Sequence, residues 1–273
     1  MMATAAFFLT IVSAVIQIVF LLRKGRPRDP VSHWLLGAAA LGLLATLALR
    51  SIQIRFAALT NTYESLVFFS AALCAVLFIM RARSDAKARP DAKARSGRKL
   101  PPAAQFGATL VCIVLLALSS SPLAPQSVQP PIPALRSLWL ALHVAFSFAG
   151  EAFFVVSFAA GISWFIARRP EAREDLDRLV ATSIGIGYPV FTAGALIFGA
   201  VWAETAWGSW WSWDPKETWA LVTWLVYTAY LHVRLVRKVR GAWSAALAIA
   251  GFAAAAFTFF GVNYLLSGFH SYR

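Results

Sequence analysis

The chain has 273 residues, of which 59% are hydrophobic and only 14% are charged, and its mean hydropathy is +0.66. Soluble domains carry about 25% charged residues, so this composition excludes an ordinary soluble fold and predicts helices that face lipid. The formal net charge is +13. A charge of this size is typical of proteins that bind nucleic acid or anionic lipid, and the placement of the charges must decide between them.

Eight apolar runs follow one another, most of them close to the roughly 20 residues that a helix needs to cross a bilayer. They lie at 3–22, 34–54, 63–80, 104–121, 137–166, 180–203, 218–236 and 242–266. The first run has no basic segment before it and is followed by Arg23-Lys24-Gly25-Arg26, so we expect a retained helix rather than a cleaved signal peptide. The sequence therefore predicts an all-α polytopic integral membrane protein with about eight transmembrane helices, forming one membrane domain over residues 1–273.

The basic residues alternate between the connections of these runs. Twenty of the 25 lysines and arginines lie at 23–28, 81–99, 168–178 and 234–240. With eight spans these connections share one side, which the positive-inside rule makes cytoplasmic, so both termini are predicted to lie outside. Charges spread over four short connections are topology signals, which argues against nucleic acid as a partner and for membrane lipid.

Two connections and the two cysteines have a simple interpretation. Residues 81–100 contain a charged repeat without an apolar face and are predicted to be a solvated cytoplasmic linker. Residues 122–136 hold five prolines and are predicted to be an outer loop without regular structure. Cys74 and Cys112 lie inside apolar runs, outside any CxxC or CxxCH motif, and are expected to be small core residues.

The connection between the sixth and seventh runs is rich in tryptophan. Six of the eleven tryptophans lie at 202–219, more than an interfacial belt requires. Aromatic faces stack on a conjugated ring, so the segment predicts a platform for a large flat ligand such as a porphyrin. Asp214, Pro215 and Glu217 also form a capping-box pattern for the seventh run, which leaves both a structural and a functional role open for Asp214 and Glu217.

A porphyrin carries two propionates, which cations on the outer side can pair. The sequence does not choose among the available cations: Lys216, Arg55, Arg136 and Arg273. Asn61 and Glu64 form a second capping-box pattern at the start of the third run.

Histidine is the most frequent axial ligand of haem iron, and the chain has four. His143, about two turns into the fifth run, and His270, after the eighth, are expected at the level of the tryptophan segment. They are the candidate axial ligands of a six-coordinate haem, with hydrogen-bonded packing as the alternative.

The remaining histidines are expected near the cytoplasmic side. His232 lies about 21 Å down the seventh run, on one face with Trp224 and Thr228. It is either an inner ligand contact or an interfacial residue beside Arg234. His33 is expected in the interfacial belt.

Glu151 is the acidic residue placed in the middle of the fifth run. It shares a helical face with Trp139, His143 and Ser147. We expect it to hydrogen-bond within the bundle rather than to orient His143. No residue has the pattern of an activated nucleophile or general base.

The segment from Trp207 to Ala220, WGSWWSWDPKETWA, resembles the WWD signature of the haem-handling cytochrome c assembly proteins. Its Asp-Pro-Lys-Glu-Thr continuation, with residues 61–65 and 261–272, is most similar to the CcsA (ResC) branch of the System II pathway. The resemblance implies that haem b is a transported substrate, held at the outer face by a WWD segment at 204–219 and by two histidines. The matching positions are Trp207, Trp210, Trp211, Trp213, Asp214, His143 and His270.

The resemblance also implies partners and a location. A histidine within the membrane matches His232 as part of an inner haem site. A CcsB-type membrane protein would act with this chain to attach haem to the CxxCH thiols of apocytochrome c, in the bacterial inner (cytoplasmic) membrane. Any catalysis would belong to a cytochrome c synthase complex.

Three alternatives remain beside that expectation. A HemX-like haem-pathway membrane protein shares the fold and is close to this chain in length. A membrane haem-b electron carrier would place paired histidines on facing helices at lipid depth, and His232 has no obvious mate. A small-solute transporter would show interrupted helices and internal repeats, and neither is found in the sequence.

Overall fold

The structure is a computed structural model that describes residues 1–23, 29–86 and 100–266, and within these ranges it contains helices and loops but no strand. Three parts of the sequence predictions lie outside the described residues: the ligand candidate His270, the cation candidate Arg273, and positions 87–99 of the predicted linker. The predicted all-α fold class is confirmed for the described part of the chain.

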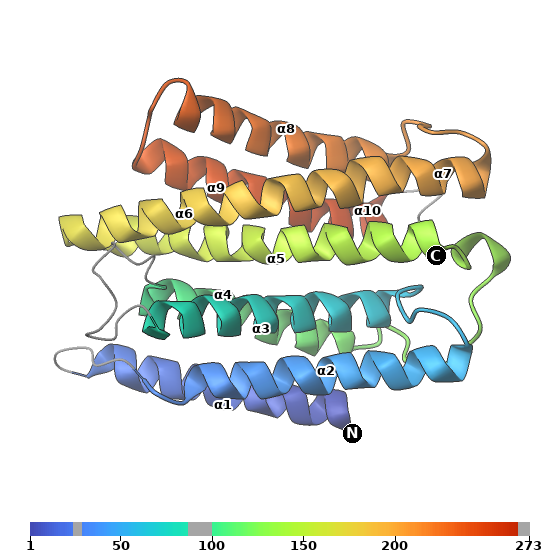
Figure 1. The fold of residues 1–273 in the computed structure, drawn as a ribbon, viewed down its shortest axis with the longest axis horizontal. Helices are drawn as coiled ribbons and strands as arrows, with labels where there is room; N and C mark the ends of the chain where they lie inside the picture. Colours follow the sequence, from blue (N-terminus) through green and yellow to red (C-terminus); the bar gives the residue numbers. More distant parts are fainter. Residues whose placement is uncertain (24–28, 87–99, 267–273) are drawn as a thin grey trace.

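Eight helical rods lie roughly along the long axis of the described structure (Figure 1). Five are single helices in the first two thirds of the chain: α1 (Met2–Leu22), α2 (Ser32–Ile54), α3 (Thr62–Ala86), α4 (Pro102–Ser119) and α5 (Leu138–Ile166). The sixth rod is continuous from α6 (Pro170–Phe191) through the π-helical η2 (Thr192–Phe198) into α7 (Gly199–Trp207). The last two are α8 (Pro215–Leu235) and the rod formed by α9 (Ala242–Ala256), η3 (Phe257–Gly261) and α10 (Val262–Leu265). Each of the eight apolar runs is thus a helix.

Seven of these rods are long and apolar enough to cross a membrane by length and composition. The exception is α8, which is 21 residues long but carries charged residues near both ends, Lys216 and Glu217 at the first and Arg234 at the second. The apolar middle of α8 is packed among other helices, so it extends along the bundle with the other rods (Figure 1).

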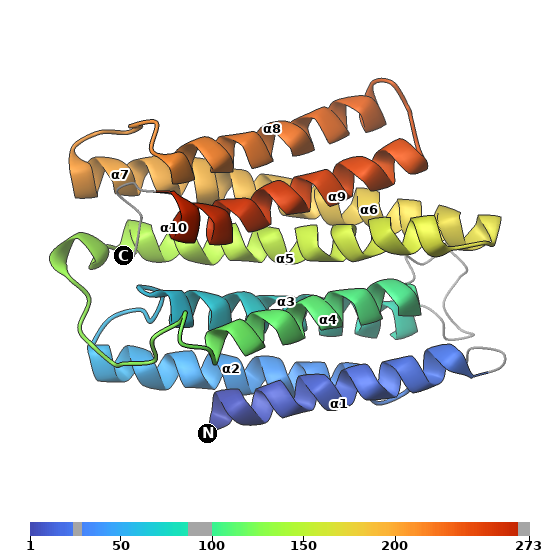
Figure 2. The ribbon, with the colours of Figure 1, turned by 180° about the vertical axis from the view of Figure 1, so that it is seen from behind.

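Helix α5 is the centre of the bundle. It packs against α3 and α4 on one side and against α6 and α9 on the other (Figures 1 and 2). The core around it is aromatic: Phe154 stacks on Tyr227 of α8 with ring centroids 3.7 Å apart, and Phe148 contacts Phe69 and Phe259. These ring contacts with three other rods fix the rotation of α5 about its own axis, and with it the direction of the side chains that α5 presents.

The predicted linker at 81–100 begins later than expected, because α3 continues to Ala86. Arg81 is 2% exposed, and its guanidinium binds the carboxylate of Asp85, the carbonyl of Asp29 and the side-chain oxygen of Gln105. Arg81, which the sequence places in a solvated linker, is therefore buried and connects α3 with α4 and with the segment before α2. The charged repeat does not indicate this burial, because Asp29 and Gln105 lie 52 and 24 residues from Arg81 along the chain.

The sixth rod begins ten residues before its apolar run, and this corrects the predicted connection at 168–178. Pro170 opens α6, and the first turns carry surface ion pairs of Arg178 with Glu174 and Asp175. Asp177 is buried and binds Arg234 and the backbone N–H of Gly241. The polar start of α6 therefore holds the connection between α8 and α9 in place.

The proline-rich loop at 122–136 contains one short 3-10 turn, η1 (Pro133–Leu135), and is otherwise irregular. It is anchored by Arg50, which donates hydrogen bonds to the carbonyls of Gln126 and Ser127. Arg50 also forms a buried ion pair with Glu64, whose backbone N–H is capped by Asn61 as the sequence predicts.

The α2–α3, α4–α5 and α7–α8 connections meet at one end of the bundle (Figures 1 and 2). We name it the Trp end because six of the eleven tryptophans lie at 202–219, in and beside the α7–α8 connection. The N-terminus of α1 and the last turn of α10 point to this same end, as an even number of rods requires. The assignment of the Trp end to the outer side of a membrane stays a prediction.

Candidate ligand-binding cavity

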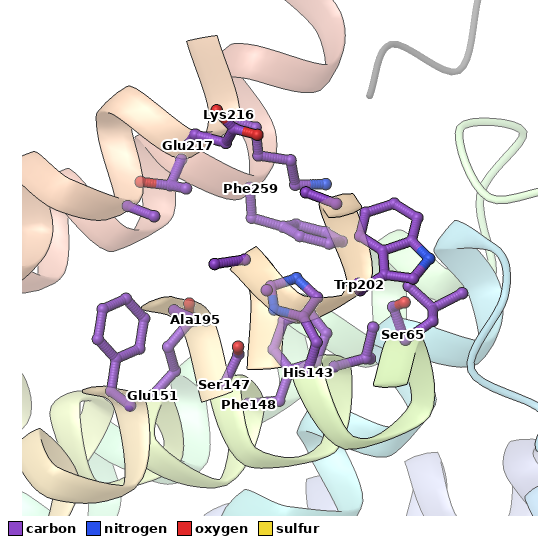
Figure 3. A pocket seen from close by; sticks show the side chains of 18 of the residues that line it. Ser65, His143, Ser147, Phe148, Glu151, Ala195, Trp202, Lys216, Glu217 and Phe259 are labelled. Carbon is purple, nitrogen blue, oxygen red and sulfur yellow. The ribbon is translucent and has the colours of Figure 1, made fainter. Parts of the chain in front are cut away.

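A cavity opens among the helices at the Trp end, with His143 in its wall (Figure 3). Its lining comes from the α2–α3 connection, α3, α5, the sixth rod from the end of α6 through η2 to α7, the α7–α8 connection, α8 and η3. The side chains that carry polar atoms or large rings are Thr62, Ser65, His143, Ser147, Phe148, Glu151, Phe191, Trp202, Trp210, Trp211, Lys216, Glu217, Thr258 and Phe259. The sequence signals from the fifth run and from the tryptophan segment therefore converge on one place.

The imidazole of His143 is held in a defined orientation. Its Nδ1 lies 2.9 Å from the carbonyl oxygen of Gly194. A carbonyl oxygen only accepts, so Nδ1 is the protonated nitrogen and Nε2 carries the lone pair of the neutral ring. Histidines that bind metal generally donate their other ring N–H to a carbonyl or carboxylate in this way. The arrangement is one in which a neutral histidine can bind a metal ion through Nε2.

Two glycines of the sixth rod make this contact possible. A Cβ on Gly194 would collide with the backbone nitrogen of Ser147, and a Cβ on Gly199 would lie 2.9 Å from Nδ1 of His143. Gly194 also accepts from the N–H of Gly199 across the wider π-helical turn of η2. The absence of side chains lets the sixth rod approach α5 closely enough for a backbone carbonyl to reach the imidazole.

Trp202 supports the histidine from one side. The two rings are nearly parallel, with an interplanar angle of 12° and centroids 6.1 Å apart. Trp202 is 3% exposed and donates its indole N–H to the carbonyl of Ala134, and Trp207 packs edge-on against it at 5.3 Å. The buried Trp202 and the half-buried Trp207 thus form an aromatic wall beside His143.

The other tryptophans of the segment divide into two groups. Trp210 and Trp211 line the cavity, and Trp210 is 58% exposed. Trp213 is 69% exposed and contacts Trp211 edge-on at 5.8 Å, away from the cavity lining. Trp213 also has a φ of 59°, a backbone conformation that costs free energy for a residue other than glycine. The cavity mouth is therefore partly covered by exposed indoles.

Asp214 and Glu217 have structural roles that the capping pattern predicts in part. The Asp214 carboxylate caps α8 by accepting from the backbone N–H of Lys216 at 2.9 Å. Glu217 accepts instead from the backbone N–H and hydroxyl of Ser212, so it closes the α7–α8 connection rather than binding the N–H of Asp214. Glu217 also lines the cavity, whereas Asp214 does not.

Beneath His143 the cavity is polar. Ser147 and Glu151 follow His143 at four-residue intervals on the same face of α5, which places Glu151 about 12 Å deeper along the helix (Figure 3). Both side chains are buried, at 8% and 7% exposed. Within the described part of the chain, Ser147 Oγ has no hydrogen-bond partner, so the floor offers a hydroxyl that can bond to water or a ligand. We expected Glu151 to hydrogen-bond within the bundle, but no hydrogen bond joins it to another of the described residues.

His232 and His33 lie away from the cavity. His232 is exposed near the last turn of α8, and His33 is buried at the start of α2, stacked on Phe78. The face that His232 shares with Trp224 and Thr228 meets the sixth rod: Trp224 donates to the hydroxyl of Thr192 in η2, and Thr228 bonds to the hydroxyl of Tyr188 in α6. The structure does not bring His232 and His143 together.

The cavity is small. The volume open to the centre of a water-sized sphere is about 100 Å³, below the roughly 300 Å³ at which drug-sized sites begin. A ligand as large as a porphyrin does not fit inside this volume.

The chain matches the family model described as Cytochrome C assembly protein over residues 59–270, a range that contains every lining residue of the cavity. The chain belongs to this family. It is a multi-pass membrane protein with a role in cytochrome c biogenesis.

Within that family the chain is of the CcsA type. It is 35% identical to the cytochrome c biogenesis protein CcsA of Prochlorococcus marinus (strain NATL1A), over 98% of this chain and 92% of the relative. It is 35% identical to CcsA of Synechococcus sp. (strain RCC307) over 91% and 88% of the two chains, and 32% identical to CcsA of Guillardia theta over 86% and 82%.

Sequence reasoning did not identify three parts of the site. The stacking of Trp202 on His143 and the carbonyl of Gly194 both come from the sixth rod, 59 and 51 residues beyond His143. Lys216 was one of four candidate cations, and it is the one that lines the cavity among the described residues. The signal that pointed to the carbonyl was present as the spacing of Gly187, Gly194 and Gly199, which marks a close helix contact.

Proposed function

We propose that the cavity binds haem b as a transported substrate at the outer face of the membrane, and that the protein presents this haem for covalent attachment to apocytochrome c. The observation that carries the proposal is the His143 imidazole, fixed by Gly194 so that Nε2 holds the lone pair, in a cavity bordered by Trp202, Trp210 and Trp211. A half-buried imidazole of fixed tautomer beside aromatic walls is what an axial haem ligand requires.

His143 is proposed as one axial ligand and His270 as the other. An incoming CxxCH segment would displace one of them and bring its thiols to the haem vinyl groups. Each thiol then adds across a vinyl double bond: sulfur bonds to the carbon next to the ring, and the thiol hydrogen ends on the terminal carbon. This addition needs no net oxidation or reduction. The contribution of the protein is to orient the two reactants, as the absence of an activated base or nucleophile predicts.

The finer assignments belong to the same proposal. A CcsB-type membrane partner, an inner membrane location and an outward-facing Trp end follow from the resemblance of the WWD segment and from the positive charges at the opposite ends of the helices. His232 is proposed as a contact for haem before it reaches His143. Its exposure near the last turn of α8 is compatible with a partner or a ligand approaching from outside the bundle.

The experiment is the absorption spectrum of the detergent-purified protein, isolated after co-expression with its chromosomal neighbours. We expect a low-spin haem spectrum in the wild type and its loss or a shift to high spin in His143→Ala and in His143→Ala, His270→Ala. Arg136→Gln is the matched control, because Arg136 lies at the Trp end without lining the cavity.

A spectrum that is unchanged in both histidine variants would contradict the site. A wild-type protein that binds no haem, either as isolated or after addition of haem, would contradict the proposed function. His232→Ala separates the inner contact, since it should lower the amount of bound haem in cells and leave the spectrum of the remaining haem unchanged.

A membrane haem-b electron carrier is the second candidate, and one geometric feature weighs against it. His143 is the sixth residue of α5 and His232 the eighteenth of α8, and both helices begin at the Trp end, so the two histidines are about 18 Å apart along the bundle. This separation is too long for the two ligands of one haem. Reversible reduction of a haem with unchanged ligation, without transfer to a CxxCH peptide, would favour the carrier.

A further inference from the structure

Lys216 is the single lysine or arginine among the described residues that line the cavity, and it shares the lining with two carboxylates, Glu151 and Glu217. It lies in the first turn of α8, where the partial positive charge of the helix N-terminus adds to that of the ammonium. Its Nζ also lies 5.7 Å from the centroid of Phe259, within reach of a cation–π contact with that ring.

The position of the ammonium is fixed by a buried amide. Lys216 Nζ donates to Oδ1 of Asn263 at 3.2 Å, and Asn263 is 3% exposed. This bond assigns the amide: its oxygen faces Lys216, and its nitrogen is a donor. Within the described residues, Asn263 Nδ2 has no hydrogen-bond partner. A buried donor of this kind costs free energy unless a ligand or water accepts from it.

We infer that Lys216 and Asn263 form a carboxylate-binding subsite that orients a dicarboxylate porphyrin in the cavity. The inference rests on the proposed function and specifies the ligand further. An ammonium has three N–H donors, so a bond to Asn263 and a bond to a ligand carboxylate are compatible. A carboxylate bound to Lys216 also comes within a few ångströms of Nδ2, because Oδ1 and Nδ2 belong to one amide group.

The other charges at the Trp end favour the same orientation. Glu217 at the rim repels a carboxylate, and it is already committed through one oxygen to Ser212. Arg50, a buried cation at the Trp end, is bonded to Glu64 and to the proline-rich loop and does not line the cavity. One propionate is therefore directed to Lys216 and the second to water at the mouth. The two vinyl groups, on the opposite edge of the macrocycle, then point away from the start of α8.

The test changes the ligand and the residue together. Haem and haem dimethyl ester, in which both propionates are esterified, are titrated into the purified full-length wild type, Lys216→Gln, Lys216→Arg and the control Arg136→Gln. We expect Lys216→Gln to weaken haem binding about tenfold or more, as expected for the loss of a hydrogen bond to a charged group, and to leave ester binding within about twofold. Lys216→Arg should restore most of the preference for haem, and Arg136→Gln should behave as wild type.

Equal weakening of haem and ester binding in Lys216→Gln would overturn the subsite, because it would show a general disturbance of the cavity. A wild type that binds haem and its ester equally well would overturn it as well, and this result does not depend on the folding of any variant. Both outcomes leave the proposed function intact if the haem spectrum still requires His143. A wild type that binds neither ligand contradicts the proposed function and the subsite together.

Discussion

Two buried polar clusters lie at opposite ends of the bundle, and they differ in whether the protein satisfies its own hydrogen-bonding groups. At the far end from the tryptophans, Arg81 bonds to Asp85, Asp29 and Gln105. The network continues to Ser32, Thr109, Gln17 and Ser13, each of which has a partner. At the Trp end, Ser147 Oγ, Glu217 Oε1 and Asn263 Nδ2 have none among the described residues.

This difference distinguishes a cluster that stabilises the fold from a cluster that can bind a ligand. A buried network in which every member is bonded holds helices in register, and losing one member leaves the others uncompensated. Buried polar atoms left without a partner cost free energy in the absence of a ligand, and this cost is offset when a ligand supplies the missing bonds. We therefore expect the Arg81 cluster to stabilise the packing of the first four helices, and the cavity to bind a ligand.

The largest expected effect is the loss of stability when the Arg81 cluster is broken. Arg81→Met removes the partner of buried Asp29 and should lower the free energy of unfolding by about 3–5 kcal/mol. Thermal unfolding in detergent measures the change. Arg83→Met is the matched control, because Arg83 is exposed two residues further along α3. Equal effects of the two substitutions would show that the buried cluster contributes no more than a surface charge.

An intermediate effect is expected where the backbone supports His143. Gly199→Ala places a Cβ 2.9 Å from Nδ1, so it should displace the imidazole and weaken haem binding by about 10–100-fold, as is usual for groups that orient a metal ligand. Gly185→Ala is the control, since a Cβ there meets no atom within 4 Å. Haem titration followed by absorbance gives both affinities. Similar affinities for the two variants would contradict the role assigned to the contact between Gly194 and His143.

The smallest effect compares one hydroxyl from each cluster. Thr109→Val removes hydrogen bonds to Gln17 and to the carbonyl of Gln105, and should cost about 0.6–2 kcal/mol of stability. Ser147→Ala removes a hydroxyl without a partner in the described structure and should change stability by less than about 0.5 kcal/mol. Thermal unfolding of both variants, in the absence of ligand, measures the two changes in stability. A larger loss from Ser147→Ala would show that the cavity floor is a structural cluster like that around Arg81.

The local features of this protein follow from the sequence. Eight apolar runs gave the eight rods, because hydropathy over about 20 residues is decided within each segment. Asn61 and Asp214 cap α3 and α8 as predicted, since a cap depends on residues two or three positions apart. The WGSWWSWDPKETWA segment indicated the family, and the family match confirmed it.

The tertiary structure decided which of these features meet. Lys216 lines the cavity while Arg55 and Arg136 do not, Arg81 is buried rather than solvated, and His143 receives its orientation from a carbonyl 51 residues away. Each of these contacts depends on the rotation and spacing of packed helices. That rotation is set by glycines and aromatic rings on other rods, whose combined effect is not contained in any one segment of the chain.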